Sequence, residues 1–230
     1  MPKITAGVSK FQKDVFPTKK DLFDKLADGQ EPETLFITCA DSRVSPSLIS
    51  QTEPGEIFVC RNAGNIIPPH GTHEEGMVAS IEYAVAVLEV KHIVVCGHSG
   101  CGAMKGAMDI NALDQLPHVK KWLSYSLTAV QVLKEKMSNK DLSEAEKLDL
   151  LIKENVLLQL RHLRTHPYVA AKLATGKIQL HGWVYDIKTG NVDAYDEEST
   201  SFKSFDDRYG KRISEILASK EHSHAHAETH

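Results

Sequence analysis

Short apolar runs alternate along much of the chain with longer stretches in which apolar residues recur at helical spacing. The runs are rich in Val, Ile, Leu and Phe, which is typical of buried strands, and they lie at 34–39, 55–61, 92–97 and 177–186. Between the second and third runs, residues 73–90 repeat apolar side chains every three or four positions and predict a helix. A strand, a helix and a strand of these lengths form a βαβ unit, so the pattern predicts a parallel sheet.

Two more helices follow, at residues 117–137 and 144–164. Ser143 and Glu146 form a capping-box pattern at the start of the second. Residues 187–196 turn at a Thr-Gly-Asn sequence and return, so they predict a hairpin with the preceding strand.

The N-terminal residues 1–30 predict an amphipathic helical arm, broken at Pro17, that packs on another part of the fold or on another subunit. The elements together predict an α/β fold with a mostly parallel central β-sheet of about four strands plus an edge strand, flanked by helices. We expect a single domain over residues 1–218. The polar, His-rich residues 219–230 are interpreted as a disordered tail, with weak metal binding as the alternative.

The bulk composition narrows the function classes. The chain has 230 residues, 41% of them hydrophobic and 25% charged, which permits a packed core. A formal net charge of −4 gives no electrostatic footprint for nucleic acid. No apolar run has the length of a membrane span and no signal-peptide pattern is present, so we expect no membrane partner and a cytoplasmic location.

The chain has four cysteines, which in a cytosolic protein of this size are expected to be thiols or metal ligands rather than disulfides. Cys60 and Cys96 lie within apolar runs and fit the role of small buried side chains. Cys39 and Cys101 fit that role poorly, because both stand where an apolar run gives way to polar or glycine-rich sequence.

Polar side chains follow two of the predicted strands. Cys39 and Asp41 end one strand, and His98 and Cys101 end another. Open α/β sheets place their sites at the carboxyl ends of strands, so the two pairs are expected to meet. Two thiolates and an imidazole are ligands that zinc prefers, and three protein ligands leave a fourth position for water. Taken singly, His98 is equally well a loop histidine and Cys101 an interior thiol; only their combination with Cys39 predicts a zinc site.

At this point a family resemblance is evident. The stretches "CADSRVSP", "RNAGNIIPP", "IEYAV", "CGHSGCGAMKG" and "LHGWVYDIKTG" resemble the β-class carbonic anhydrases over residues 10–196, in the bacterial or plant-like branch with an open zinc site. The resemblance implies a Zn²⁺ enzyme that converts carbon dioxide reversibly into bicarbonate and a proton, through attack of zinc-bound hydroxide on CO₂. It also implies a homodimer or a larger homo-oligomer.

The resemblance assigns roles to matching residues. Cys39, His98 and Cys101 would bind zinc. Arg43 would hold Asp41 off the metal through charge-assisted hydrogen bonds, and Asp41 would accept a hydrogen bond from the zinc-bound hydroxide. Asp41 as a fourth zinc ligand at low pH is the alternative.

The same resemblance implies a substrate pocket built partly from a neighbouring subunit. Gln30 would donate to a substrate oxygen, Phe58, Ala63 and Tyr83 would form the apolar wall, and the Gly102 backbone would lie beside the metal. Judged from the residues alone, Gln30 is a solvated residue at a helix end, and Phe58 and Tyr83 are ordinary core side chains.

One position departs from a branch of the family that closes its site and holds bicarbonate with a tryptophan, an arginine and a tyrosine. Phe36 stands where that tryptophan would be, although Arg61 and Tyr185 match the other two. The departure argues for the open site. His70 and His73 are candidate proton shuttles by residue type alone.

Two other functions stay open at this stage. A related zinc hydrolase acting on carbon disulfide or carbonyl sulfide would keep the same ligands. A non-catalytic zinc-binding or redox-sensing module would use Cys39 and Cys101 without turnover, but it has no need of Gln30, Asp41 and Arg43.

Overall fold

A computed structural model describes residues 1–72, 75–138 and 141–227, with side chains as far as Ile216. Its β-strands are β1 (Thr34–Cys39), β2 (Ile57–Asn62), β3 (His92–His98), β4 (Gln179–Tyr185), β5 (Val192–Asp196) and β6 (Ser201–Ser204). Its α-helices are α1 (Pro2–Lys10), α2 (Lys20–Ala27), α3 (Pro46–Ser50), α4 (Glu75–Glu82), α5 (Gly102–Met108), α6 (Pro117–Leu123), α7 (Leu127–Met137), α8 (Glu144–Leu163), α9 (Pro167–Ala174) and α10 (Phe205–Ala227).

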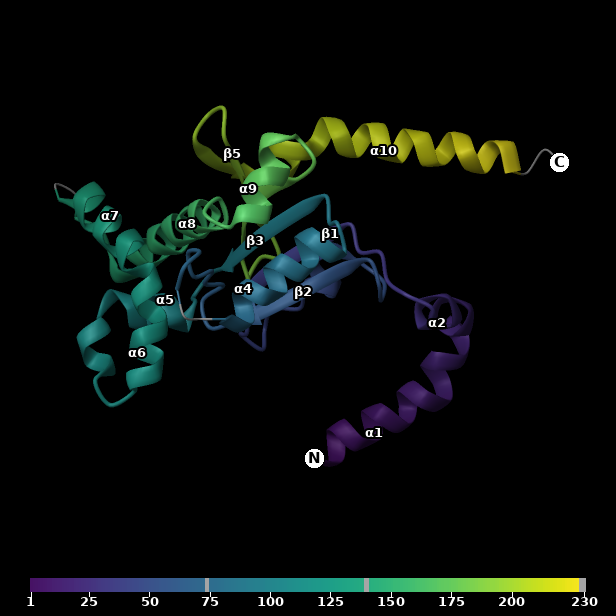
Figure 1. Ribbon diagram of the computed structural model, residues 1–230, viewed down its shortest axis with the longest axis horizontal. Coiled ribbons are helices and arrows are strands. Elements are labelled where there is room, and N and C mark those ends of the chain that lie inside the picture. Colours follow the sequence, from purple (N-terminus) through teal and green to yellow (C-terminus); the bar gives the residue numbers. More distant parts are fainter. Residues whose placement is uncertain (73–74, 139–140, 228–230) are drawn as a thin grey trace.

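Within the described residues, the strands form one six-stranded sheet in the order β2-β1-β3-β4-β5-β6 (Figure 1). The first four run parallel, and β5 and β6 are added antiparallel. The predicted α/β fold with a mostly parallel sheet is confirmed. Strand β6 was not predicted, because its four residues are too few and too polar to stand out as an apolar run.

The parallel register brings the carboxyl ends of the central strands to one edge of the sheet. Cys39 pairs with Asn62 at the end of β2, while Thr38 pairs with Cys96 on β3. Because β3 extends two residues past this pair, His98 comes to the same edge as Cys39.

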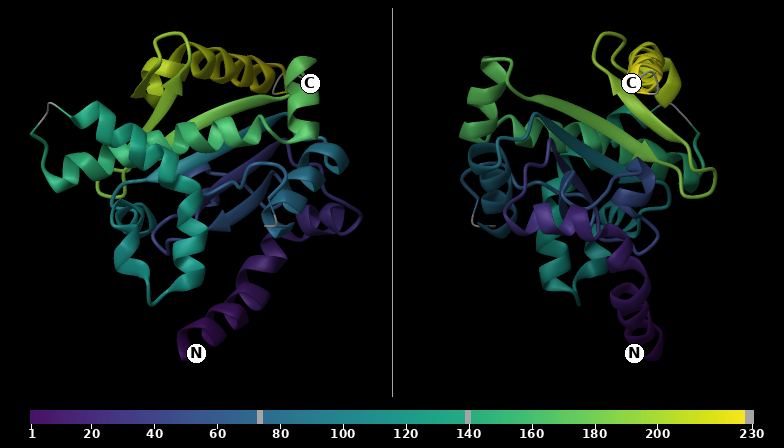
Figure 2. Two further views of the ribbon diagram at one scale, coloured as in Figure 1. Left: turned by 60° about the vertical axis from the view of Figure 1, so that its left-hand side comes forward. Right: turned by 90° about the vertical axis from the view of Figure 1, so that its right-hand side faces the viewer.

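Helices cover both faces of the sheet (Figure 2). On one face, α4 and α8 pack on Leu35, Ile37 and Val95. Helix α8 comes close because Gly182 has no side chain; a Cβ there would lie 2.9 Å from Leu160 Cδ1 and 3.0 Å from Val156 Cγ1. Helix α8 begins at the predicted capping box, since Ser143 accepts a hydrogen bond from the Glu146 amide and the Glu146 carboxylate accepts one in return.

On the other face, α10 packs its aromatic residues against Trp183 of β4, with the Phe205 and Trp183 ring centroids 5.2 Å apart. Helix α10 continues to Ala227 and so reaches into the segment predicted to be a disordered tail. The domain boundary at residue 218 stays a prediction.

The N-terminal arm extends away from the body of the molecule (Figures 1 and 2). It consists of α1, a π-helical turn (Phe11–Val15), a 3-10 turn (Phe16–Lys19) and α2. The 3-10 turn contains Pro17, where the sequence predicts a break. In the part of the chain that the structure describes, no helix combines the length and hydropathy needed to cross a membrane.

Candidate metal centre

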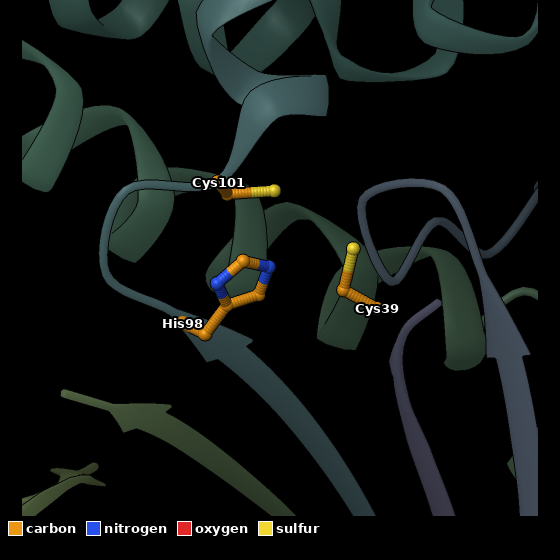
Figure 3. Close-up of side chains that lie close together, drawn as sticks. All are labelled: Cys39, His98 and Cys101. Atoms are coloured by element: carbon orange, nitrogen blue, oxygen red, sulfur yellow. The ribbon is translucent and has the colours of Figure 1, made fainter. Parts of the chain in front are cut away.

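Three potential metal ligands converge at the carboxyl edge of the sheet (Figure 3). Cys39 ends β1, His98 ends β3, and Cys101 directly precedes α5. One ligand atom from each lies within 4.8 Å of the others, and all three residues are buried. The structure therefore brings together the side chains that the sequence analysis grouped.

The imidazole of His98 is oriented so that only its Nε2 is available to bind a metal ion. Its Nδ1 lies 3.0 Å from the Ser99 carbonyl oxygen, and donation there leaves a lone pair on Nε2. Nε2 is buried and has no hydrogen-bond partner within the described residues. A buried polar atom without a partner is costly, and a metal ion at Nε2 removes that cost.

The two thiols complete a donor set for a soft or borderline metal. The Cys39 sulfur accepts a hydrogen bond from the Gly64 amide at 3.3 Å. Hydrogen bonding between the two sulfurs lowers the pKa of Cys39 and, together with burial, raises the pKa of Cys101, so the pair favours carrying one proton between them. All four cysteines are free thiols. Two sulfurs and one imidazole nitrogen fit zinc.

A carboxylate held by an arginine stands beside this group. Arg43 donates to Asp41 Oδ1 from Nε at 2.9 Å and to Oδ2 from Nη2 at 2.8 Å, and the Arg43 amide adds a bond of 3.0 Å to Oδ1. These hydrogen bonds hold the pKa of Asp41 well below the usual carboxyl range. Asp41 Oδ2 lies 3.9 Å from Nε2 of His98, so the carboxylate faces the nitrogen that would bind metal.

The arginine of the next strand fixes the backbone around the same residues. Arg61 donates from Nε to the Cys39 carbonyl oxygen at 3.1 Å and from Nη2 to the Asp41 carbonyl oxygen at 2.7 Å. Phe36 stands where the closed-site branch of the family would have a tryptophan. It is buried, and its ring lies edge-to-face with that of Trp183, with the two ring centroids 5.9 Å apart. Tyr185 is the register partner of His98.

Two of the expected pocket residues adjoin groups of the candidate ligand triad, Cys39, His98 and Cys101, or the amide that contacts it. Ala63 directly precedes Gly64, whose amide contacts the Cys39 sulfur, and Gly102 directly follows Cys101. Both are exposed.

The other three pocket residues lie at the opposite end of the sheet. Phe58 pairs with Leu35, four positions before the pair at Cys39, which is about 13 Å along a strand. Tyr83 packs its ring 6.0 Å from that of Phe58. Gln30 precedes β1 and is exposed, so the whole length of β1 separates it from Cys39. One chain does not bring these three to its own triad.

The candidate shuttle His70 is exposed, and its amide donates to Thr165 Oγ1 at 2.9 Å. This contact ties His70 to the turn after α8. His73 lies outside the described residues.

Sequence reasoning missed the residues whose hydrogen bonds hold the candidate ligand Cys39 and the loop beside it in place. These include Gly64, which donates to Cys39, and Asn155 and Gln159, which are buried in α8. One signal was available: polar residues at 155 and 159, one helical turn apart, interrupt the apolar side of the predicted 144–164 helix.

Comparison with known proteins gives a consistent result. The family model described as "Carbonic anhydrase" matches residues 34–192. A carbonic anhydrase of Pseudomonas aeruginosa is 50% identical over 204 residues, covering 89% of this chain and 91% of that protein. Carbonic anhydrase 1 of Escherichia coli O157:H7 is 47% identical over 202 residues, covering 88% and 91%.

Solved structures agree with these sequence relatives. The β-carbonic anhydrase CcaA superimposes with a TM-score of 0.86 at 43% identity, covering 89% of this chain and 98% of that one. A match from Sordaria macrospora, described in work on two tetrameric β-carbonic anhydrases, has a TM-score of 0.68 at 34% identity and covers 84% and 92%.

Proposed function

The chain belongs to the β-carbonic anhydrase family, and from this membership we propose how its residues hydrate carbon dioxide to bicarbonate and a proton. Enzymes of this family use zinc, and we assign the zinc ligands to Cys39, His98 and Cys101. One observation carries the assignment: Nε2 of His98, which has no hydrogen-bond partner among the described residues, faces both thiols and the Asp41 carboxylate.

Zinc, when bound, supplies a nucleophile near neutral pH by lowering the pKa of a water molecule. Asp41 has the task of orienting that nucleophile. Its Oδ2, 3.9 Å from Nε2 of His98, would accept a hydrogen bond from the attacking oxygen and so turn an oxygen lone pair toward the substrate carbon. The low pKa of Asp41 keeps it an acceptor throughout the neutral range.

Arg43 keeps the site open. Its guanidinium holds both carboxylate oxygens of Asp41 in place, so a movement of Asp41 onto the metal would disturb these two hydrogen bonds. A bidentate arginine–carboxylate pair has strong charge-assisted hydrogen bonds in a fixed geometry. We therefore propose the open site as the resting state, with Asp41 on the metal as a low-pH state.

The substrate pocket is proposed to be completed by a second subunit. Gln30, Phe58 and Tyr83 are too far along the sheet from Cys39 to line the pocket of their own chain. Placed by a partner, Gln30 would donate its amide to a substrate oxygen, and Phe58 and Tyr83 would enclose the carbon dioxide. The description of the Sordaria macrospora relatives as tetrameric supports a homo-oligomer.

The exposed apolar side chains of the arm also support association. They are Met1, Ile4, Val8, Phe11 and Phe16. Apolar residues gathered on an extended arm are typical of a surface that another subunit covers. We further propose a cytoplasmic location, because a reducing compartment keeps ligand thiols from forming disulfides.

The activity is tested by stopped-flow hydration of carbon dioxide on zinc-loaded protein, scanned from about pH 6.5 to 9, the range around the pKa of zinc-activated water. We expect activity that is present near neutrality and rises with pH. Absence of hydration with zinc bound at one equivalent per chain would refute the proposed reaction.

The two-subunit pocket is tested by complementation. Gln30→Ala and Cys101→Ser are each expected to abolish most activity. In a twofold-symmetric dimer, co-expression of the two variants makes half of the dimers mixed, and each mixed dimer has one intact site, so about a quarter of the wild-type rate returns. A pocket built within one chain would recover nothing.

A further inference from the structure

The amide that contacts the Cys39 sulfur belongs to a peptide group that is held at both ends. The peptide joining Ala63 to Gly64 donates its N–H to Cys39 Sγ at 3.3 Å. Its carbonyl oxygen, on Ala63, accepts a hydrogen bond from Nε1 of Trp122 at 2.8 Å. The indole of Trp122, on α6, is thus connected to the metal-ligand sulfur through a single peptide group.

The direction of these two bonds matters. In a trans peptide the C=O and N–H point in opposite directions, so a donor at the oxygen fixes the direction of the N–H. A donor at the oxygen also polarises the peptide and strengthens the N–H as a donor. The Trp122 indole therefore both aims the Gly64 amide at Cys39 and makes it a better hydrogen-bond donor.

The following peptide is anchored from the opposite side. Asn155 of α8 donates from Nδ2 to the Gly64 carbonyl oxygen at 3.1 Å. The Asn155 Oδ1 accepts from Ser126 Oγ at 2.9 Å and from Gln159 Nε2 at 2.8 Å, so the amide cannot turn without losing these bonds. Ser126, Asn155 and Gln159 are all fully or almost fully buried.

We propose that Trp122 is a positioning residue for the metal centre, acting through the Ala63–Gly64 peptide to hold and tune the Cys39 sulfur, with Asn155 as the second anchor. The inference rests on the proposed zinc site and adds residues to its support. The N–H withdraws negative charge from the Cys39 thiolate, which otherwise donates that charge to the metal. Outer groups of this kind typically change metal affinity by 10–100-fold when removed.

The chain offers a matched pair of substitutions, because it has two tryptophans. Trp122→Phe removes the indole N–H while keeping an aromatic ring. Trp183→Phe makes the same chemical change on the sheet face that α10 covers, where the indole N–H donates to Tyr209 Oη at 3.3 Å. Asn155→Ser, with a side chain too short to reach the Gly64 carbonyl, cuts the second anchor.

Two measurements on the full-length protein separate positioning from a general loss of stability. The first is zinc affinity, by competition with a chelator at a temperature where every variant is folded by circular dichroism. The second is the absorption spectrum of the Co²⁺-substituted protein, whose sulfur-to-cobalt charge-transfer band reports the electron donation of the thiolates.

We expect Trp122→Phe to weaken zinc binding about 10-fold, because the Cys39 sulfur is then held less firmly in place. The charge-transfer band should move to longer wavelength, because the thiolate then donates more charge. Asn155→Ser should change both in the same direction. Trp183→Phe should stay within about twofold of wild type in affinity, since its indole N–H donates to Tyr209 and not to a peptide group that contacts a candidate ligand.

Wild-type affinity and an unmoved band in Trp122→Phe would overturn the proposal, and so would an equal loss in Trp183→Phe. If the wild-type protein itself binds no zinc, the proposed metal centre fails rather than this inference alone.

Discussion

Gly64 lies where backbone conformation, packing and the metal centre meet, so Gly64→Ala is a quantitative test of the site. Gly64 has φ +82°, in the left-handed region that costs an L-residue about 1–2 kcal/mol. A Cβ there would lie 2.9 Å from Met104 Cε and 3.0 Å from Ala103 Cβ, next to the loop that carries Cys101. Overpacking of this kind costs about 1–3 kcal/mol.

The two contributions sum to a loss of about 2–5 kcal/mol in the free energy of unfolding. Gly71 provides the control, because it has φ +90° and a Cβ there would meet no atom of the described residues within 4 Å. Gly71→Ala should therefore cost only the backbone contribution of about 1–2 kcal/mol. The difference between the two variants, about 1–3 kcal/mol, isolates the contact with Ala103 and Met104.

The assay is urea unfolding of metal-free protein at a fixed chain concentration, because an oligomer's stability depends on concentration. Thermal unfolding should agree, since 1 kcal/mol shifts the midpoint of a chain of this length by about 2–4 °C. Equal losses in Gly64→Ala and Gly71→Ala would refute the reasoning, because they would show that the close contacts at Gly64 relax at no cost.

Further predictions concern the charged groups and the metal. Asp41→Asn should lower the rate of CO₂ hydration about 10²–10³-fold while one zinc per chain remains, as stopped-flow rates and metal analysis would report. Arg43→Met should let the pKa of Asp41 rise toward the ordinary carboxyl value of about 3.9, which leaves Asp41 ionised near neutrality, so the acid side of the pH–rate profile between about pH 6.5 and 9 should keep its midpoint. Because the folded state lowers the pKa of Asp41, the ionised carboxylate stabilises the folded protein at pH values above the ordinary carboxyl pKa. This stabilisation is lost as the pH falls through the lowered pKa. In Arg43→Met, the thermal unfolding midpoint should therefore fall less steeply with decreasing pH than in the wild type. Chelation of zinc should lower stability by about 2.7 kcal/mol relative to protein held at a hundredfold excess of free zinc over its dissociation constant, measured by calorimetry.

Several local elements were determined by the sequence itself. The run at 34–39 coincides with β1, and the capping box at Ser143 begins α8, because apolar periodicity and capping are properties of neighbouring residues. The π-helical turn at Tyr83–Val87 and the strand β6 were not predicted, since the turn lies within a run of ordinary helical periodicity and β6 is too short and too polar to stand out as an apolar run.

For the site, the sequence supplied residue types and their positions at strand ends, which was enough to group Cys39 with His98 and Cys101. It could not supply distances across the sheet. The separation of Phe58 and Gln30 from the triad follows from the register of β2 on β1 and from the place of Gln30 before β1, so only the tertiary structure divides the expected pocket into two parts.

The links to the Cys39 sulfur were likewise invisible in the sequence. Trp122 is 59 residues from Ala63, and Asn155 is 91 residues from Gly64. Sequence pattern expresses which side chains are buried and which residues favour a helix, strand or turn, because those preferences act between near neighbours. Which buried donor meets which carbonyl depends on how helices from the second half of the chain pack on loops from the first, and only the folded chain decides that.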